Sequence, residues 1–516
     1  MGRWSLRRWA GATAATLVLA SGCGTTVHSG RGRSSDSNPS GGLAASDAGS
    51  PAAGGGPANS LPGGGGGAGG GAAGASQAGA ASRRVPGAGA GTGGPASQAT
   101  RQASVVRLGV IYLKGLDAAY KSAGAKSATT DSQADYAAVV NDINVHGGIA
   151  GRRVLPFYYA IDAASATAPA DQLQAACTHF TQDQPVDVVL SYTPGSGGVL
   201  VSCLRARRVP LVIGSNEADV SADSLSGSPM LWEPAEVSLD RLEQVLPRFL
   251  IGAHWADARW GSDPRCATVE TRIGVVTFDQ PDWRSAYTKN LAPEFEATGH
   301  KVYDVAFLSV SGNTANQLAD ASAAVQNAVL KFSTDCVDHV VFVSNVAVDY
   351  LFMNVAEQQQ YAPRYGLSSL EAPPVIIQNL ANPRTQLTGS IGVGWSPFSD
   401  VNIQDFDAAA RAPGQRCMDV LKRAGLAPVD NNSSILAAPS CEGPYFAAAA
   451  FGRWLDSPPS NGLVDAVNGL GSSYQPTGTF SASFRATQHD GASAYRALTF
   501  VDSCTCYRYG SGLQPW

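Results

Sequence analysis

The chain has 516 residues and a formal net charge of −5 at pH 7, from 36 Lys and Arg and 41 Asp and Glu residues. An acidic balance argues against nucleic acid as a partner and against attachment to a membrane surface by charge. We therefore expect neither.

The first 22 residues have the pattern of a signal peptide. Arg3, Arg7 and Arg8 precede an apolar run, residues 9–20, that is shorter than the ~20 residues needed to span a bilayer. Small residues then precede Cys23, as in the lipobox of bacterial lipoproteins. We expect a lipid on Cys23 to anchor the protein outside the cytoplasm; a secretory signal with a chance cysteine is the alternative. Cleavage would change the net charge to −5 − 3 = −8.

Residues 23–103 are expected to form a disordered tether. The segment consists largely of Gly, Ala, Ser and Pro and has almost no large apolar residue. Such a chain cannot bury enough surface to offset the entropy lost on ordering. Its length would let the folded part move away from the membrane.

The folded part begins with the elements of a βαβ unit. Residues 104–112 predict a strand, and TDSQ at 130–133 has the form of a helix capping box. Gly147 and Gly148 would end the helix, because glycine adopts the left-handed conformation without steric cost. Residues 154–161 predict the next strand. The helix is predicted from apolar residues at helical spacing, at Tyr136, Val139, Val140 and Ile143.

The segment NDINVHGGIAGRRV, residues 141–154, resembles the start of type I periplasmic substrate-binding proteins. The nearest likeness is to the branched-chain amino-acid receptors of ABC importers, and it covers about residues 105–509. It implies a monomer of two doubly wound α/β lobes with a ligand cleft between them. It also implies a small polar ligand, such as an amino acid, and delivery of that ligand to an ABC permease, with no enzymatic activity and no cofactor. From the pattern alone, any doubly wound α/β domain remains possible.

The first lobe supplies polar residues at the ends of two predicted strands, in segments 187–198 and 211–220. In open α/β sheets ligands bind outside the carboxyl ends of the strands, where helix N-termini present free N–H groups. The resemblance implies that Ser196 holds a ligand carboxylate; the alternative is that it only makes a turn. We expect the ligand to contact Tyr192, Thr193, Ser196, Ser215 and Asn216.

The second lobe supplies three further predicted contacts, of which Trp283 and Glu371 follow from the resemblance and Asn345 from its position after a strand. Trp283 would cover the ligand, Asn345 lies at the tip of a later strand, and Glu371 would pair with a ligand ammonium. Related amino-acid receptors often carry an aromatic residue at the place of Asn345, so a more polar or larger ligand is equally compatible. A solvated Glu371 beside a loop is the alternative. Residues 252–271 look like an insertion, fixed by Cys266.

The expected organisation follows from these elements. Residues 1–22 are the signal peptide, 23–103 the tether, 104–232 the first lobe and 233–437 the second. Residues 438–516 would return to the first lobe, with a helix over 445–457 and a closing hairpin that turns at 489–492.

Eight cysteines remain besides Cys23, and an even number in an exported chain predicts disulfides. Cys177 and Cys203 follow neighbouring strands, and Cys417 and Cys441 flank an irregular segment, so we expect these two bridges. Cys504 and Cys506 on a strand would make a strained bridge. A metal site there is the alternative, although no second ligand pair stands elsewhere at suitable spacing.

The sequence gives weaker support to an enzymatic or a sensing function. The sequence has no HExxH, GxSxG or P-loop motif. Asp279, Asp282 and Glu371 could act as paired carboxylates in glycoside hydrolysis. A ligand-sensing receptor of the same fold, without transport, is a further alternative.

Overall fold

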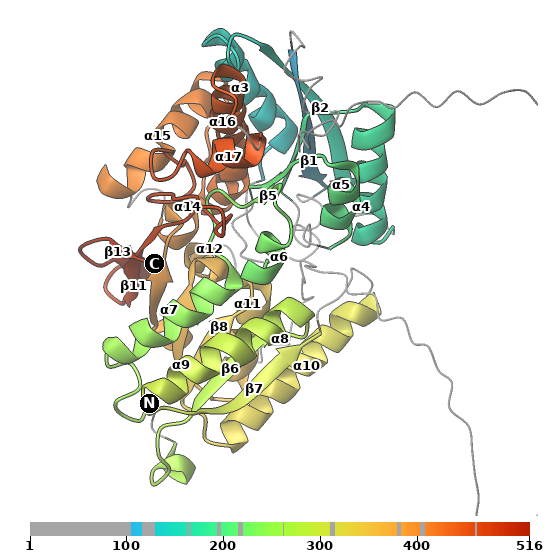
Figure 1. Cartoon of the computed structure of the whole chain (residues 1–516). Coiled ribbons are helices and arrows are strands. Elements are labelled where there is room, and N and C mark those ends of the chain that lie inside the picture. Colours follow the sequence, from blue (N-terminus) through green and yellow to red (C-terminus); the bar gives the residue numbers. More distant parts are fainter. Residues whose placement is uncertain are drawn as a thin grey trace, which may run out of the picture. The chain divides into compact units, whose positions relative to one another are not determined.

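The computed structural model describes residues 105–115, 129–162, 165, 167–192, 198–214, 220–261, 263–309, 315–378, 383–402, 408–459 and 462–516, without the side chains of 315–321, 378 and 408–413. Within these residues the chain forms two α/β lobes, as the sequence predicted (Figure 1). The signal peptide, the tether and Cys23 lie outside the described residues. So do four of the predicted ligand contacts, Thr193, Ser196, Ser215 and Asn216.

The first lobe has a five-stranded sheet in the order β2-β1-β3-β4-β5, with every pair parallel. Its strands are β1 (Val105–Lys114), β2 (Arg153–Asp162), β3 (Val188–Ser191), β4 (Leu211–Ile213) and β5 (Leu231–Trp232). Alternate residues of β1 enter two separate cores: Val110 packs with α3 (Ser132–Val145), and Ile111 packs on the opposite face. That second face is covered by α4 (Pro169–Thr178), its continuation η1 (His179–Asp183) and α5 (Val199–Arg207). A parallel sheet with both faces covered requires this two-sided apolar pattern.

The predicted helix between β1 and β2 is present, with a different cap. Helix α3 begins at Ser132, and the Asp131 carboxylate, not Thr130, accepts a hydrogen bond from the Ala134 N–H at 3.1 Å. Gln133 instead accepts from the Tyr112 hydroxyl. Gly147 and Gly148 follow the helix with φ of 99° and 73°, as the sequence predicted. Any of several polar residues in this run can cap a helix, so the pattern did not fix which one does.

The second lobe has a mixed sheet in the order β12-β11-β10-β9-β8-β6-β7, and β13 (Gln514–Pro515) pairs with β11. Its parallel strands are β6 (Ile273–Phe278), β7 (Val302–Leu308), β8 (His339–Val343), β9 (Arg364–Ser368) and β10 (Ile391–Gly394). The antiparallel strands are β11 (Ala494–Val501) and β12 (Cys506–Tyr509).

The remaining helical segments of both lobes follow in chain order. Those between β4 and β8 are α6 (Ala222–Ser226), α7 (Leu239–Gly252), η2 (Pro264–Cys266), α8 (Pro281–Ala286), η3 (Tyr287–Leu291), α9 (Ala292–Ala297) and α10 (Ala315–Thr334). Those after β8 are α11 (Val346–Gln358), η4 (Ser369–Glu371), α12 (Pro373–Gln378), α13 (Arg384–Leu387), α14 (Pro397–Asp400), α15 (Ala408–Arg423), α16 (Asn431–Asp456) and α17 (Leu463–Asn468).

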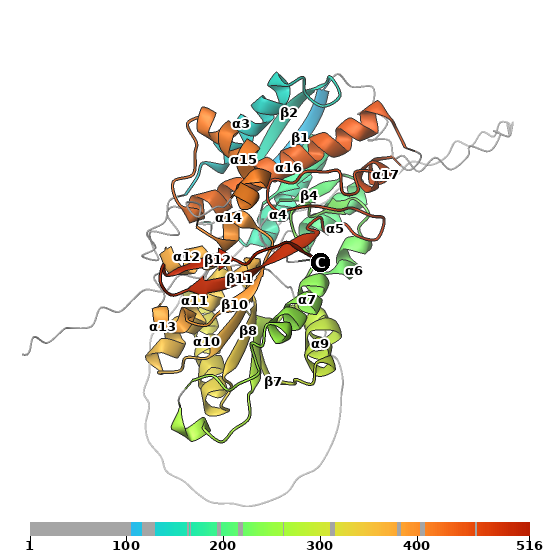
Figure 2. The same cartoon turned by 90° about the vertical axis from the view of Figure 1, so that its left-hand side faces the viewer.

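The division between the lobes differs from the expected one. Helix α15 already packs on α3 of the first lobe, where Cys417 and Leu421 are buried, so the boundary placed at 437 is too late (Figure 2). Helix α16 begins at Asn431, not at 445, and runs through Pro439 and Pro444. Prolines normally interrupt a helix, but most of α16 is buried, and this packing offsets their cost.

The C-terminal strands also depart from the expectation. Strand β11 pairs antiparallel with β10, so residues 494–509 extend the second sheet and not the first. The turn of the preceding loop lies at 485–488, where Arg485 and Gln488 exchange backbone hydrogen bonds. The segment predicted to turn, 489–492, instead bonds to Glu233, where the chain leaves the first lobe. These pairings are long-range, and local turn residues could not predict them.

Four disulfides link the described residues, and two of them are the expected bridges. Cys177–Cys203 joins α4 to α5, and Cys417–Cys441 joins α15 to α16. Cys504 and Cys506 also form a bridge, but they do not share a strand as expected, because residues 502–505 form a turn and only Cys506 begins β12.

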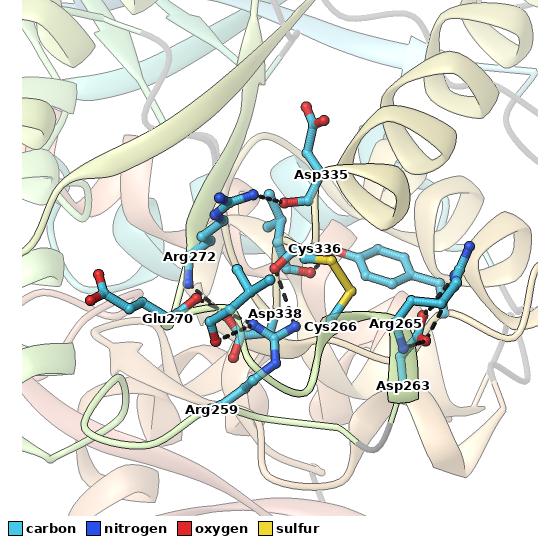
Figure 3. The surroundings of a disulfide bond; sticks show 12 residues. Arg259, Asp263, Arg265, Cys266, Glu270, Arg272, Asp335, Cys336 and Asp338 are labelled. Carbon is cyan, nitrogen blue, oxygen red and sulfur yellow. Dashed lines mark hydrogen bonds and ion pairs between the residues drawn. A yellow bond between two sulfur atoms is a disulfide. The ribbon is translucent and has the colours of Figure 1, made fainter.

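The fourth bridge, Cys266–Cys336, fixes the insertion 252–271 to the second lobe (Figure 3). Asp338 lies beside it and accepts hydrogen bonds from the backbone N–H groups of Trp260 and Arg272, both at 2.8 Å. Burial acts to raise the pKa of Asp338, but the neighbouring His339 side chain, together with these two bonds, holds it below its ordinary value. The insertion is thus held by a covalent bond and by a buried carboxylate.

None of the helices in the described ranges combines the length and the apolar character that a membrane crossing requires.

Candidate functional site

The strand ends of the second lobe bring the three predicted contacts of that lobe to one edge. Strands β6, β8 and β9 are parallel neighbours, so their carboxyl ends lie side by side. Trp283 lies in α8 after β6, Asn345 caps α11 after β8, and Glu371 ends η4 after β9. The tertiary fold therefore groups residues that are up to 88 positions apart in sequence (371 − 283 = 88). This edge is where an open α/β sheet binds its ligands.

Glu371 is fully buried at this edge and is bonded within its own lobe. Its carboxylate accepts from the Ser368 N–H at 2.5 Å, the Ser368 hydroxyl at 2.8 Å and the Ser344 N–H at 3.3 Å. The first bond, together with the backbone N–H groups of η4 that donate to the Ser368 hydroxyl oxygen, forms a capping box for η4. The third ties the end of β9 to the end of β8. In this structure the carboxylate is turned into the protein, so an ammonium of a ligand could reach it only by replacing these donors.

A second buried acid, Asp349, lies beside Glu371 and changes its electrostatics. The Ser344 hydroxyl donates to Asp349, and both carboxyl groups are inaccessible to solvent. Burial raises the pKa of Glu371 to about 8. Burial and the charge of Glu371 raise the pKa of Asp349 well above its ordinary value. Two negative charges so close together and buried would cost much free energy, so the pair retains a proton near neutral pH.

The other two predicted contacts also have structural partners. The Trp283 side chain is 4% exposed and packs edge-to-face on Phe278, with ring centroids 4.9 Å apart. Asn345 accepts hydrogen bonds from the N–H groups of Ala347 and Val348 at 3.1 and 3.2 Å. An Asn directly before an apolar helical run is a common N-cap, and this signal was available in the sequence.

The first lobe contributes one described residue of the predicted set. Tyr192 follows β3 directly and is half-buried. Strand β4 ends at Ile213 beside it, and the Gly214 N–H bonds to the Ser191 carbonyl at 2.9 Å. The remaining predicted contacts follow both strands in the sequence and lie outside the described residues.

A polar contact between the lobes was missed by the sequence analysis. Ser221 and Ser224, at the start of α6 in the first lobe, both donate to one Asp282 carboxylate oxygen in α8, at 3.1 and 2.8 Å. Lys289 in η3 forms an ion pair with Asp223 at 2.9 Å. A serine-rich turn carries no sign of its distant partner, so the sequence offered no signal for this contact.

The carboxylates of the hydrolase hypothesis have separate surroundings. Asp279 pairs with Arg284, which lowers the pKa of Asp279. Asp282 binds the two serines of the first lobe, and Glu371 is buried. In the ranges that the structure describes, no group of three or more His, Cys, Asp or Glu side chains is placed to hold a metal ion.

Comparison with solved structures identifies the fold. An ABC transporter substrate-binding protein from Desulfitobacterium hafniense, in complex with Leu, matches at 13% identity and a TM-score of 0.52, over 78% of this chain and 99% of that chain. A solute-binding protein from Rhodopseudomonas palustris HaA2, in complex with p-hydroxybenzoic acid, matches at 12% identity and a TM-score of 0.55, over 80% and 97%. A type 1 periplasmic binding protein from Bordetella pertussis Tohama I matches at 12% identity and a TM-score of 0.54, over 79% and 100%.

No family model matches the sequence, and a search of curated proteins finds no match. The structural likeness nevertheless extends over nearly the whole length of each of these proteins. The described part of the chain has the fold of the type I periplasmic binding proteins of ABC transporters.

Proposed function

We propose that this protein is an extracytoplasmic solute-binding protein, anchored by lipid on Cys23, which captures a small polar ligand between its lobes and delivers it to an ABC permease. The observation that carries the proposal is the likeness of the fold to solute-binding proteins over 97–100% of their length. The polar strand ends of both lobes support it, because open α/β sheets bind ligands there.

Ligand binding would act through the arrangement of the lobes. A ligand that contacts both lobes stabilises only the closed arrangement, so binding shifts the population towards it. The first lobe would hold the ligand through Tyr192, Thr193, Ser196, Ser215 and Asn216. The second would use Trp283, Asn345 and Glu371. The permease would then dock on the closed form.

The proposed ligand is an amino acid or a similar small carboxylate. Of the proteins with similar structures, one is in complex with Leu and another with p-hydroxybenzoic acid, and both of these ligands carry a carboxylate. They differ in the ammonium group, which only Leu has. The proposed role of Glu371 therefore separates the two kinds of ligand: an ammonium would draw the carboxylate away from Ser368 and Ser344, whereas a ligand without one would leave it buried.

Native mass spectrometry of the purified protein tests the proposal, because a tightly bound solute is carried through purification. A thermal-shift panel follows, since a ligand at 100 times its dissociation constant adds about 2.7 kcal/mol to the free energy of unfolding. No bound mass, and no shift with amino acids or other small carboxylates, would count against the function.

Titration calorimetry of two variants then tests the site. Removal of a charged hydrogen bond in Glu371→Ala should weaken a ligand with an ammonium group about 10- to 150-fold. Trp283→Phe should weaken any ligand that Trp283 covers, while keeping most of the packing on Phe278. Unchanged affinity in both variants would place the site elsewhere.

A further inference from the structure

A cavity of about 400 Å³ opens on the first lobe, where α3, α15 and α16 meet the segment 474–477. Figure 2 shows these three helices grouped on one side of the first sheet. The volume lies within the range of small-molecule sites. None of the residues proposed to hold the ligand between the lobes lines this cavity.

Arg416 of α15 supplies a fixed cation at the cavity. Its guanidinium lies 4.0 Å from the centre of the Tyr445 ring, and one N–H donates to the Asp142 carboxylate at 3.1 Å. Among the described residues, Asp142 is the one acceptor bonded to this guanidinium, which carries five N–H donors. The Arg416 side chain is 57% exposed. A guanidinium that is stacked and oriented in this way can bind a carboxylate through two parallel hydrogen bonds.

The negative charges near the cavity are buried and already hydrogen-bonded. The Asp142 side chain is 7% exposed and also accepts from Arg423 at 3.1 Å and from the Tyr445 hydroxyl at 3.3 Å. Glu442 is 1% exposed and accepts from the Tyr474 hydroxyl, from Thr477 and from the Gly478 N–H. These two carboxylates are nearly inaccessible to solvent, whereas the Arg416 guanidinium is exposed, so a ligand in the cavity would meet a cation, which favours an anion.

Small side chains leave room for an apolar body beside this cation. Ala448 and Ala449 of α16 line the cavity together with Ile143 of α3 and the aromatic rings of Tyr445 and Tyr474. Apart from Arg416, the rest of its lining consists of His146, Gly148, Gln475, Pro476 and Thr477. A ligand that is only an inorganic anion would leave this apolar surface in contact with water. We propose that the cavity is a second ligand site, which binds a small organic carboxylate with its carboxylate on Arg416 and its apolar body against the two alanines.

Titration calorimetry of the purified full chain with benzoate tests this site. Wild-type protein should bind benzoate, and Arg416→Gln should bind it about 10- to 150-fold more weakly because a charged hydrogen bond is lost. Ala448→Leu should abolish binding, since the larger side chain occupies the cavity while Arg416 remains. Thermal melts would show whether each variant is folded. If Arg416→Gln does not fold, Ala448→Leu still tests the site.

Arg423→Gln is the matched control. Arg423 also bonds to Asp142 but does not line the cavity, so this variant should retain wild-type affinity. Equal losses in Arg416→Gln and Arg423→Gln would show that only the Asp142 charge network matters, and would overturn the site. The absence of benzoate binding at millimolar concentration, or unchanged affinity in both Arg416→Gln and Ala448→Leu, would overturn it as well. Because the proposed interlobe ligand is tested with Glu371 and Trp283 variants, failure of either site is distinguishable from failure of the other.

Discussion

Asp282 of the second lobe accepts a hydrogen bond from the Ser224 hydroxyl of the first lobe at 2.8 Å. Ser221 donates to the same oxygen at 3.1 Å, so one carboxylate receives two donors across the boundary between the lobes. Val220 and Leu225, which flank the two serines in the sequence, are buried in the core of the first lobe. Trp283, next to Asp282, is buried in the core of the second. Asp282 and the two serines are each held by the core of their own lobe, so these hydrogen bonds would break if the lobes moved apart. The contact therefore depends on the arrangement of the lobes.

We expect Asp282→Ala to favour separation of the lobes. If the contact exists only in the closed arrangement, its loss should weaken ligand binding by about 1 kcal/mol, or roughly fivefold. Titration calorimetry with the ligand found by mass spectrometry, together with small-angle scattering of the free protein, measures both effects. Lys289→Gln is the control: it removes an exposed ion pair with Asp223, which should contribute little. Equal affinities in wild type and Asp282→Ala would rule out a role in closure.

We expect the disulfides to differ in their effect on stability according to the loop that each one closes. Cys266 and Cys336 are separated by 70 residues, and the chain-entropy model assigns about 4 kcal/mol to such a loop. Double substitution of this pair by Ser should therefore lower the free energy of unfolding far more than the same change at Cys504 and Cys506, which are two residues apart. Urea unfolding of the two variants measures the difference. Peptide mapping without reduction should recover all four bridges, and free thiols at these positions would refute the pairing.

We expect the buried acids to make the protein less stable as the pH rises. The pKa of Glu371 is raised from its ordinary 4.5 to about 8, so the folded state binds a proton that the unfolded state has already lost. This contribution is fully present below about pH 4.5 and decreases by up to about 1.4 kcal/mol per pH unit towards pH 8. Glu371→Gln cannot lose a proton and should flatten this part of the dependence, as measured by thermal unfolding between pH 5 and 9. The control Asp183→Asn, at a carboxyl that is 66% exposed, should leave the pH dependence of stability unchanged. A wild-type curve parallel to that of Glu371→Gln would contradict the protonated pair.

We expect Cys23→Ser to release the protein from the membrane fraction. The prediction rests on the basic residues, the apolar run and the small residues that precede Cys23. Fractionation of cells followed by mass spectrometry of the N-terminal peptide provides the measurement. Wild-type protein found wholly in the medium, with no lipid on Cys23, would show that the segment is an ordinary secretory signal.

Local patterns in the sequence determined the first βαβ unit and the class of the fold. The apolar spacing of α3 follows from its 3.6-residue period, and Gly147 and Gly148 have the positive φ values that their position required. The bridges Cys177–Cys203 and Cys417–Cys441 could be expected because each joins elements that are neighbours along the chain. In each of these cases the decisive interactions lie within a short stretch of sequence.

Only the tertiary structure decided which lobe each later segment joins and which polar groups are buried. Strand β11 extends the second sheet because it pairs with β10 about a hundred residues earlier, a choice that no local pattern encodes. Glu371 was predicted at a strand end, but whether its carboxylate faces a ligand or the protein depends on Ser344, Ser368 and Asp349, which the fold brings around it. The contact of Asp282 with Ser224 depends in the same way on the packing of two separate cores. Sequence spacing determines the direction of a side chain along its own element, whereas burial and partnership arise from the packing of elements that are distant in the chain.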